Sequence, residues 1–185
     1  IMAPADETEC RQMLTTAYRH AGPAAVRYPR GTGPGRLPGS DLEPLPVGRA
    51  VICRRGHRVA ILAFGSRVAA ALEAAESIDA SVVNMRFIKP LDRETVLAMA
   101  ERHELLVTVE EHAVAGGAGS AVNEALAASH CPCDVLNLGI PDRFINHGDH
   151  AAQLAACGLD AAGILAAINA NTAFRQAADT QKETG

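Results

Sequence analysis

The residues best suited to chemistry in this sequence are two arginines in the stretch AAVRYPRG, residues 24–31. Arg27 and Arg30 bracket a Tyr-Pro pair at the end of a short apolar run, directly before a glycine-rich segment. A guanidinium at a strand end can grip a phosphate through two parallel hydrogen bonds. Two interpretations stay open for each arginine, a phosphate ligand or a structural ion pair. The residues alone favour the ion pair, and more strongly for Arg27.

Two further motifs lie next to each other, and both allow chemistry. In VEEH, Glu110 and His112 share one side of a strand end, where a carboxylate near an imidazole could do acid–base work. No third partner is near in sequence, so a surface pair or a subunit contact is favoured. The turn GGAGSA, residues 116–121, could offer backbone N–H groups to an anion. It lacks dinucleotide or P-loop spacing, so a plain strand–helix turn with tight packing is favoured.

Metal-ligand residue types occur in two loops. Cys131 and Cys133 form a C-x-C pair, but zinc needs a second pair at suitable spacing and the sequence has none. The sequence NHGDH gathers His147, Asp149 and His150, although a metal site also requires fixed geometry around its ligands. We expect incidental thiols at the first place and a solvated loop at the second. No metal ligand is therefore predicted.

Composition argues against several classes of function. The net charge is −4 and aromatic residues make up 3%, so neither a basic field nor a stacking platform for nucleic acid is expected. No uninterrupted apolar run approaches the length of a membrane span, and none is predicted. Five scattered cysteines, an odd number, favour reduced thiols and a cytoplasmic location. Because the first residue is Ile1, we expect a piece of a longer chain.

The elements that position these residues begin with a helix and a strand. The helix starts after Asp6, and Glu9 follows three residues later as in a capping box. Gly22 ends the helix, and residues 24–28 are predicted to form a strand. Residues 31–46, rich in Gly and Pro, are predicted to be an interdomain linker. The predicted buried face of the helix consists of Cys10, Met13, Leu14, Ala17 and Tyr18.

After the linker, near-continuous apolar strands alternate with helices. This pattern predicts an α/β fold with a mostly parallel five-stranded sheet and helices on both faces. The first two strands are predicted to form a hairpin at Arg55–Gly56, which gives one antiparallel edge strand. Ser66 and Asp92 are predicted helix caps. Strands are expected at 48–55, 57–65, 80–88, 104–111 and 133–140, and helices after Ser66, after Asp92, after the turn at 116–121 and at 160–170.

A set of sequence motifs along the chain favours the phosphate-ligand interpretation of Arg30. They occur in the order IMAPADETECRQML, GPAAVRYPRG, ILAFGS, NMRFIKPLD, LVTVEEHAVAGGAGSAVNEAL and LNLGIPDRFINHGD. Together they resemble the carboxy-terminal portion of the 1-deoxy-D-xylulose-5-phosphate synthase family, over about residues 1–170. The resemblance implies that residues 1–30 end a pyrimidine-binding domain and residues 31–46 are a linker. It implies a transketolase-like C-terminal domain at 47–172, followed by a polar tail at 173–185.

The resemblance also implies an activity for the full-length protein. Family members are cytoplasmic homodimers that use thiamine diphosphate and Mg²⁺ to condense pyruvate with D-glyceraldehyde 3-phosphate, forming 1-deoxy-D-xylulose 5-phosphate and CO₂. Arg30 falls on the family arginine that binds the phosphate of the triose. The catalytic, cofactor-binding and metal-binding motifs of the family are absent here, so we expect the 185 residues alone to be inactive and to serve dimerisation and the walling of the site.

Two alternatives remain open beside the synthase. One is the corresponding part of a transketolase or of a 2-oxo acid dehydrogenase beta subunit, which share the pattern of strand, VEE, glycine turn and helix. The other is a non-catalytic oligomerisation module of the same fold. The roles of Arg27, of His112 and of the loop with His147, Asp149 and His150 stay undecided.

Overall fold

The computed structural model describes residues 1–37, 39 and 42–171, and the predicted polar tail at 173–185 lies outside them. Within the described residues, helices and strands alternate as the apolar pattern predicts. In chain order they are α1 (Glu7–Arg19), β1 (Val51–Arg54), β2 (Val59–Ala63), α2 (Arg67–Ile78), β3 (Ser81–Asn84), α3 (Arg93–Ala100), β4 (Leu105–Ala113), α4 (Ala118–Ala128), β5 (Asp134–Ile140), α5 (His150–Ala156) and α6 (Ala161–Ala170).

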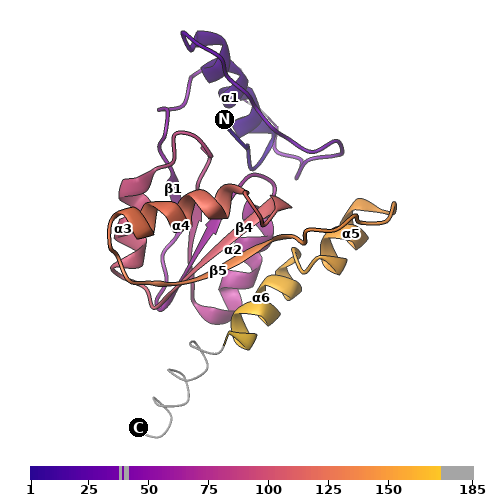
Figure 1. Ribbon diagram of the computed structural model, residues 1–185. Helices are drawn as coiled ribbons and strands as arrows, with labels where there is room; N and C mark the ends of the chain where they lie inside the picture. Colours follow the sequence, from indigo (N-terminus) through magenta and orange to yellow (C-terminus); the bar gives the residue numbers. More distant parts are fainter. Residues whose placement is uncertain (38, 40–41, 172–185) are drawn as a thin grey trace, which may run out of the picture.

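The strands form a single sheet, which lies between the helices in Figure 1. It has five strands in the order β1-β3-β2-β4-β5. Strands β3, β2, β4 and β5 run parallel, and β1 lies antiparallel at the edge beside β3. β2, β3 and most of β4 are buried on both faces, which explains why they read as continuous apolar runs rather than alternating ones, whereas β5 at the edge is only partly buried. The predicted mixed sheet with one antiparallel edge strand is confirmed.

The predicted hairpin between the first two strands is wrong. β1 pairs with β3, with Val51 opposite Asn84, so β3 lies between β1 and β2. The turn at Gly56 crosses the beginning of β3, where the Gly56 N–H donates to Ser81 Oγ at 2.9 Å. A Cβ on Gly56 would lie 2.1 Å from the carbonyl oxygen of Asp79. The glycine that suggested a hairpin turn is thus needed for a close crossing.

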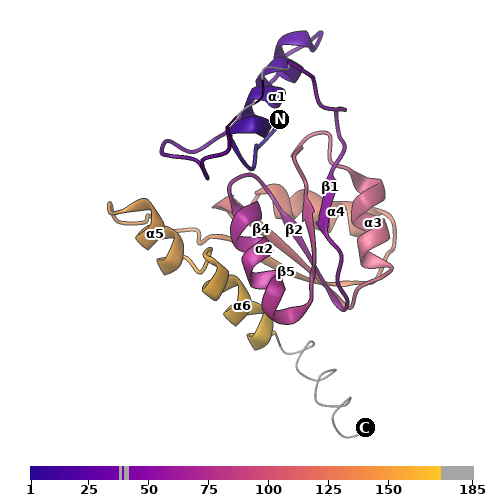
Figure 2. The same cartoon turned by 180° about the vertical axis from the view of Figure 1, so that it is seen from behind.

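Helices cover both faces of the sheet, as predicted (Figures 1 and 2). α2 and α6 pack on one face against side chains such as Ile61 and Val107. α3 and α4 pack on the other face against the alternate side chains, such as Leu62 and Leu106. Asp92 caps α3 as predicted, because its carboxylate accepts from the Thr95 N–H at 3.1 Å. The result is a three-layer α/β domain.

The segment from His150 to Ala170 contains a helix that the sequence analysis missed. α5 begins after Asp149, whose carboxylate accepts from the Ala152 N–H at 3.0 Å, and a turn separates α5 from α6. The segment has a mean hydropathy of 1.6 and is long and apolar enough to cross a membrane by length and composition alone. A core helix passes the same test. Leu154 and Ile164 pack into the core beside α2, but only 17% of the apolar segment is buried.

The amino-terminal segment lies across the end of the sheet at which the parallel strands finish (Figure 1). Met2 bridges Val26 on one side and Phe87 on the other. The predicted strand at 24–28 is reduced to this one bridge, and β3 ends at Asn84 because the chain turns away to reach Met2. A small apolar cluster beneath the segment consists of Met2, Met13, Leu45 and Phe87. The predicted domain boundaries stay a prediction.

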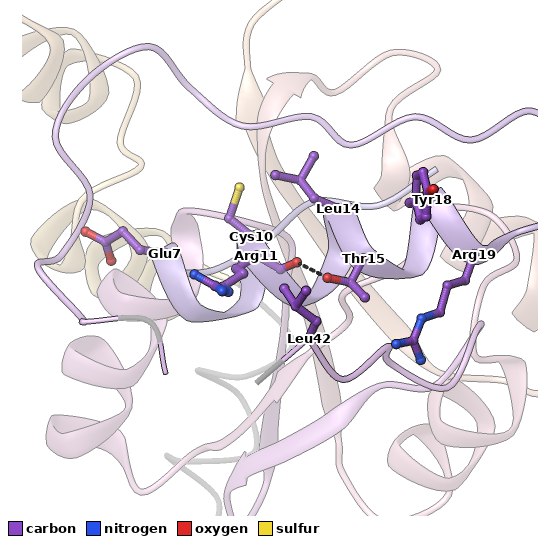
Figure 3. Close-up of a pocket in the computed structure, with 8 residues that line it drawn as sticks. All are labelled: Glu7, Cys10, Arg11, Leu14, Thr15, Tyr18, Arg19 and Leu42. Atoms are coloured by element: carbon purple, nitrogen blue, oxygen red, sulfur yellow. Dashed lines mark hydrogen bonds between the residues drawn. The ribbon is translucent and has the colours of Figure 1, made fainter. Parts of the chain in front are cut away.

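The buried face of α1 differs from the predicted face. Glu9, Met13 and Thr16 are buried, so only Met13 fits the prediction fully. Leu14 is 49% exposed and Tyr18 is 89% exposed. Figure 3 shows these two side chains beside Cys10 and Leu42, lining a shallow hollow on the outer side of the helix. The side of α1 that carries Glu9 is turned inward because Asn84 and Arg86 hydrogen-bond to the Glu9 carboxylate, and this leaves part of the apolar side exposed.

Candidate functional site

Arg30 lies in an exposed loop between the Met2–Val26 bridge and the glycine-rich segment. Within residues 1–37, 39 and 42–171, no hydrogen bond or ion pair joins its guanidinium to another group. The guanidinium is therefore accessible to an anion from solvent. A contact between Arg30 and a substrate phosphate stays a prediction.

Arg27 is placed quite differently, although it lies only three residues earlier. Its Nη2 donates to the carbonyl oxygen of Glu111 at 2.8 Å and lies 3.7 Å from Glu111 Oε1. Its backbone N–H also donates to the carbonyl of Met2 at 2.8 Å. These contacts confirm the structural ion pair that the sequence favours for Arg27.

Glu111, at the end of β4, is the centre of a polar cluster. Ser66 Oγ donates to Glu111 Oε2 at 2.5 Å, His150 Nε2 lies 3.1 Å from Oε1, and Arg67 Nε lies 3.8 Å from Oε2. Burial by itself raises the pKa of Glu111. The hydrogen bonds from Ser66 and His150, with the charges of Arg27 and Arg67, outweigh burial and hold the pKa below its usual value. Glu111 is thus a charged anchor at neutral pH.

The same cluster explains why α2 has no side-chain hydrogen bond at its N-cap. Ser66 stands at the N-cap of α2 as predicted, but its side chain makes no capping bond, because its hydroxyl is used by Glu111. Arg67 follows it, buried, and donates to the carbonyl of Leu159 at 3.0 Å. Burial lowers the pKa of Arg67, while the charge of Glu111 works in the opposite direction. The cluster therefore ties α2 to β4 and to the turn before α6.

Glu110 and His112 do not form an acid–base pair. The Glu110 carboxylate is buried and accepts from the N–H groups of Ala118 and Gly119 at 2.6 and 2.8 Å, at the beginning of α4. His112 is exposed, and its Nδ1 lies 3.2 Å from the carbonyl oxygen of Ala113. The free N–H groups of the glycine turn are therefore satisfied by a carboxylate of the chain itself.

The glycine turn at 116–121 packs as tightly as the sequence predicts. A Cβ on Gly119 would lie 2.6 Å from Thr108 Oγ1 and 2.7 Å from Asn137 Nδ2. A Cβ on Gly117 would lie 2.4 Å from the Ala113 carbonyl oxygen. These close approaches confirm a strand–helix turn in which glycine serves packing.

The candidate metal ligands serve other roles. Asp149 caps α5, and His150 contacts Glu111, so the loop with His147 divides among different partners. Cys131 and Cys133 are free thiols, partly buried against the core face that α3 and α4 cover. Among the described residues, no group of three or more His, Cys, Asp or Glu could hold a metal ion.

The glycine-rich segment after Arg30 is fixed to the start of α1. Glu7 Oε1 accepts from the Gly35 N–H at 2.8 Å, and Oε2 accepts from the Arg36 N–H at 3.1 Å. Arg36 Nε also lies 3.4 Å from Asp6 Oδ2. The described part of the predicted linker is therefore folded back on α1 rather than being an open tether.

Glu9 joins α1 to the end of β3. Its carboxylate accepts from Asn84 Nδ2 at 2.9 Å, from Arg86 Nε at 2.6 Å and from the Ala5 N–H at 2.8 Å. Asp6 accepts from the Glu9 N–H at 2.8 Å, so both halves of the predicted capping exchange are occupied, with Ala5 in place of the cap residue. This contact turns the polar side of the helix inward.

Sequence reasoning missed Glu7 and Glu111 as parts of this site. Their partners come from distant places in the chain, 28 residues away for the Glu7–Gly35 bond and 84 for the Arg27–Glu111 bond. The one available signal for Glu111 was the doubled acid in VEEH, of which only Glu110 was considered. Glu7 offered no signal beyond an acidic first helical turn.

Comparison with known proteins agrees with the family resemblance seen in the sequence. Residues 48–164 match the transketolase C-terminal domain family. The chain is 62% identical over 173 residues to a 1-deoxy-D-xylulose-5-phosphate synthase of Ralstonia nicotianae. It is 60% identical over 168 residues to that of Methylobacillus flagellatus. Both alignments cover 91% of this chain but 27% of the relative, so the chain spans about a quarter of the length of the curated relatives it matches.

A solved structure supports the fold at lower identity. It is described as a split gene transketolase in an inactive beta4 tetramer, and it superposes with a TM-score of 0.82 at 34% identity. The superposition covers 94% of this chain and 56% of that chain. The shared architecture thus extends over nearly all of the chain.

Proposed function

Since this chain belongs to the transketolase C-terminal domain family, we propose that it is the carboxy-terminal part of a 1-deoxy-D-xylulose-5-phosphate synthase. The observation that carries the proposal is about 60% identity to such synthases across 91% of the chain. Alignments of 168 and 173 residues are longer than the matched stretch 48–164, so they include much of the segment that carries Arg30.

The complete protein would condense pyruvate with D-glyceraldehyde 3-phosphate to form 1-deoxy-D-xylulose 5-phosphate and CO₂. In this proposal Arg30 binds the phosphate of the triose. Its planar guanidinium can donate two parallel hydrogen bonds to a phosphate, and no other described group competes for it. Holding the phosphate would fix the position of the aldehyde at the other end of the triose.

Thiamine diphosphate and Mg²⁺ would be bound by parts of the protein outside this chain. Two observations support this assignment: among the described residues no group of three or more His, Cys, Asp or Glu could hold a metal ion, and the Glu110 carboxylate already occupies the N–H groups at the amino terminus of α4. This chain would then wall the site and support a homodimer, and without the rest of the protein it would be inactive. Free cysteines such as Cys10 and Cys53 support a cytoplasmic location.

A second candidate is the corresponding part of a transketolase, which the superposition at TM-score 0.82 favours. The two candidates differ in the donor substrate, since the synthase uses pyruvate and releases CO₂. The higher identity, 62% to a synthase against 34% to the transketolase structure, supports the synthase.

The test is an assay of the complete gene product with pyruvate and D-glyceraldehyde 3-phosphate. We expect 1-deoxy-D-xylulose 5-phosphate and CO₂, and formation of product only from ketose donors would support the transketolase. Arg30→Ala should lower kcat/KM for the triose by a factor equivalent to about 2–3 kcal/mol of transition-state binding, the size of a charge-assisted contact. The matched control is Arg55→Ala, an exposed arginine in the turn between β1 and β2. An unchanged KM for the triose in Arg30→Ala would contradict the phosphate assignment.

A further inference from the structure

We propose that Glu7 and Glu111 are positioning residues for Arg30, holding its loop at both ends so that it receives the triose phosphate. The inference rests on the proposed function and deepens it, because it names the groups that set affinity for one of the two substrates. Neither carboxylate would touch substrate. Both act through hydrogen bonds to residues that flank Arg30.

The first anchor lies before Arg30. Arg27 is held by the carbonyl and the carboxylate of Glu111, and its backbone N–H is held by Met2. Glu111 is itself held by Ser66 and His150, so this anchor is attached to the sheet domain rather than to the loop. Only two residues, Tyr28 and Pro29, separate it from Arg30, and the proline ring fixes one of their backbone torsions.

The second anchor lies after Arg30. Glu7 accepts two backbone N–H groups, those of Gly35 and Arg36, and so stops the loop as a bidentate clamp. Hydrogen bonds from its own backbone N–H and from Gly35 hold the pKa of Glu7 below its usual value, so the clamp is charged at neutral pH. Because Glu7 is in the first turn of α1, the clamp attaches the loop to a helix.

The residues between the anchors explain why a clamp is needed. Gly31 and Gly35 have φ values of +155° and +84°, and a Cβ on either would meet no atom within 4 Å. Steric contact therefore does not restrain the loop at these two glycines, and the close contact lies at Gly33, where a Cβ would lie 2.5 Å from Glu7 Oε1. A glycine-rich segment without restraint samples many conformations, and a ligand that orders it must bear that entropic cost. With both anchors in place, part of the conformational entropy of the loop is already lost when the protein folds, so the ligand has less of it to remove.

Glu7 gives the cleaner test of the two anchors. It is partly buried and bonds only to the loop and to its own helix turn, whereas Glu111 also holds Ser66, Arg67 and His150. Glu7→Ala removes both acceptors, and Glu7→Gln retains one oxygen for the Gly35 N–H. Glu104→Ala is the matched control, because Glu104 pairs with Arg58 at the opposite end of β4.

The experiment measures KM for each substrate and kcat in the complete gene product. Glu7→Ala should raise KM for D-glyceraldehyde 3-phosphate about tenfold and Glu7→Gln about threefold, from the added cost of ordering the loop. The KM for pyruvate and kcat should stay within about twofold, as should all constants of Glu104→Ala. Hydrogen exchange should become faster at residues 31–36 and stay unchanged in the middle of α1, which shows that the variant is folded.

A double variant decides whether Glu7 acts through Arg30. If it does, adding Glu7→Ala to Arg30→Ala produces no further rise in the triose KM. Additive effects would overturn the inference, as would an unchanged triose KM or an equal rise for pyruvate in Glu7→Ala. These outcomes leave the proposed function intact when the wild-type protein forms product. Absence of synthase activity in the wild-type protein would reject the proposed function and the inference with it.

Discussion

The amino-terminal segment and the sheet domain are stabilised in different ways. The sheet domain has two apolar layers, one on each face of the sheet, and its central strands β2 and β3 are buried at every position. The segment rests on a small cluster around Met13 and Phe87, with carboxylates at Glu9 and Glu111 linking it to the sheet domain. Large apolar side chains such as Tyr18 stay exposed on it.

This difference means that the two regions should respond to different perturbations. Apolar burial is insensitive to pH, whereas an anchor made of carboxylates depends on their ionisation. Loss of core volume should affect the whole chain, because the segment docks on the sheet. Loss of a carboxylate anchor should release the segment and leave the sheet domain folded. The following changes test this separation, from the largest expected effect to the smallest.

Ile61→Ala should cause the largest loss of stability, and it should destabilise the sheet domain and the amino-terminal segment together. Ile61 is fully buried in the middle of β2, and the cavity should cost about 2–5 kcal/mol of unfolding free energy. Urea unfolding followed by hydrogen exchange should show lower protection in both the sheet and α1. Lower protection in α1 alone would contradict the view that the sheet supports the segment.

Glu9→Ala should separate the regions. It leaves Asn84 and Arg86 without their acceptor, at a cost of about 1–3 kcal/mol, and Arg86 can regain water because it lies near the surface. Hydrogen exchange in α1 should become faster, while β2 and β4 keep their protection. An equal loss in β2 and β4 would show that the regions unfold together, and Glu94→Ala on the surface serves as the control.

Acidification should act on the segment through Glu111. Its pKa is lower in the folded chain than the usual 4.5, so the unfolded state binds more protons as the pH falls. The stability from this group is complete above pH 4.5 and is lost as the pH falls through the lowered pKa. The backbone N–H signal of Arg27 in an NMR titration should shift over that acidic range. In Glu111→Gln this step should be absent, and an identical step in both proteins would count against the assignment.

Leu14→Ser should have the smallest effect on this chain. The side chain is half exposed in the shallow hollow of Figure 3, so the change should alter the unfolding free energy by no more than about 0.5 kcal/mol. Met13→Ser, one position earlier and fully buried, is the matched comparison and should destabilise strongly. Equal effects at the two positions, measured by urea unfolding, would mean that α1 turns its predicted face inward.

The sequence predicted the layers of the sheet domain but not all of its pairings. Continuous apolar runs locate β2 and β4 because both faces of these strands are buried. The partner of β1 depends on the crossing at Gly56, which in sequence looks the same as a tight hairpin turn. Helix α5 was missed because it is short and its cap, Asp149, belongs to a loop considered for metal binding.

The site was less predictable than the fold, for a physical reason. Arg27 and Arg30 lie three residues apart with the same side chain, and only the fold places Glu111 beside one of them. The inward turn of Glu9 likewise depends on Asn84 and Arg86, more than 70 residues away. Periodicity describes which residues share a helix face, but it does not show which face finds partners.

The carboxylate of Glu110 has a consequence for how the chain discriminates among anions. It is an intramolecular ligand for the N–H groups that begin α4, only eight residues away along the chain. A tethered ligand at so short a range competes at an effective concentration on the order of millimolar or above. A free phosphate at a lower concentration would therefore not displace it. The Glu110 carboxylate thus keeps the amino terminus of α4 from binding anions in general. In the proposed function, phosphate selection is then left to Arg30, whose surroundings the protein can tune.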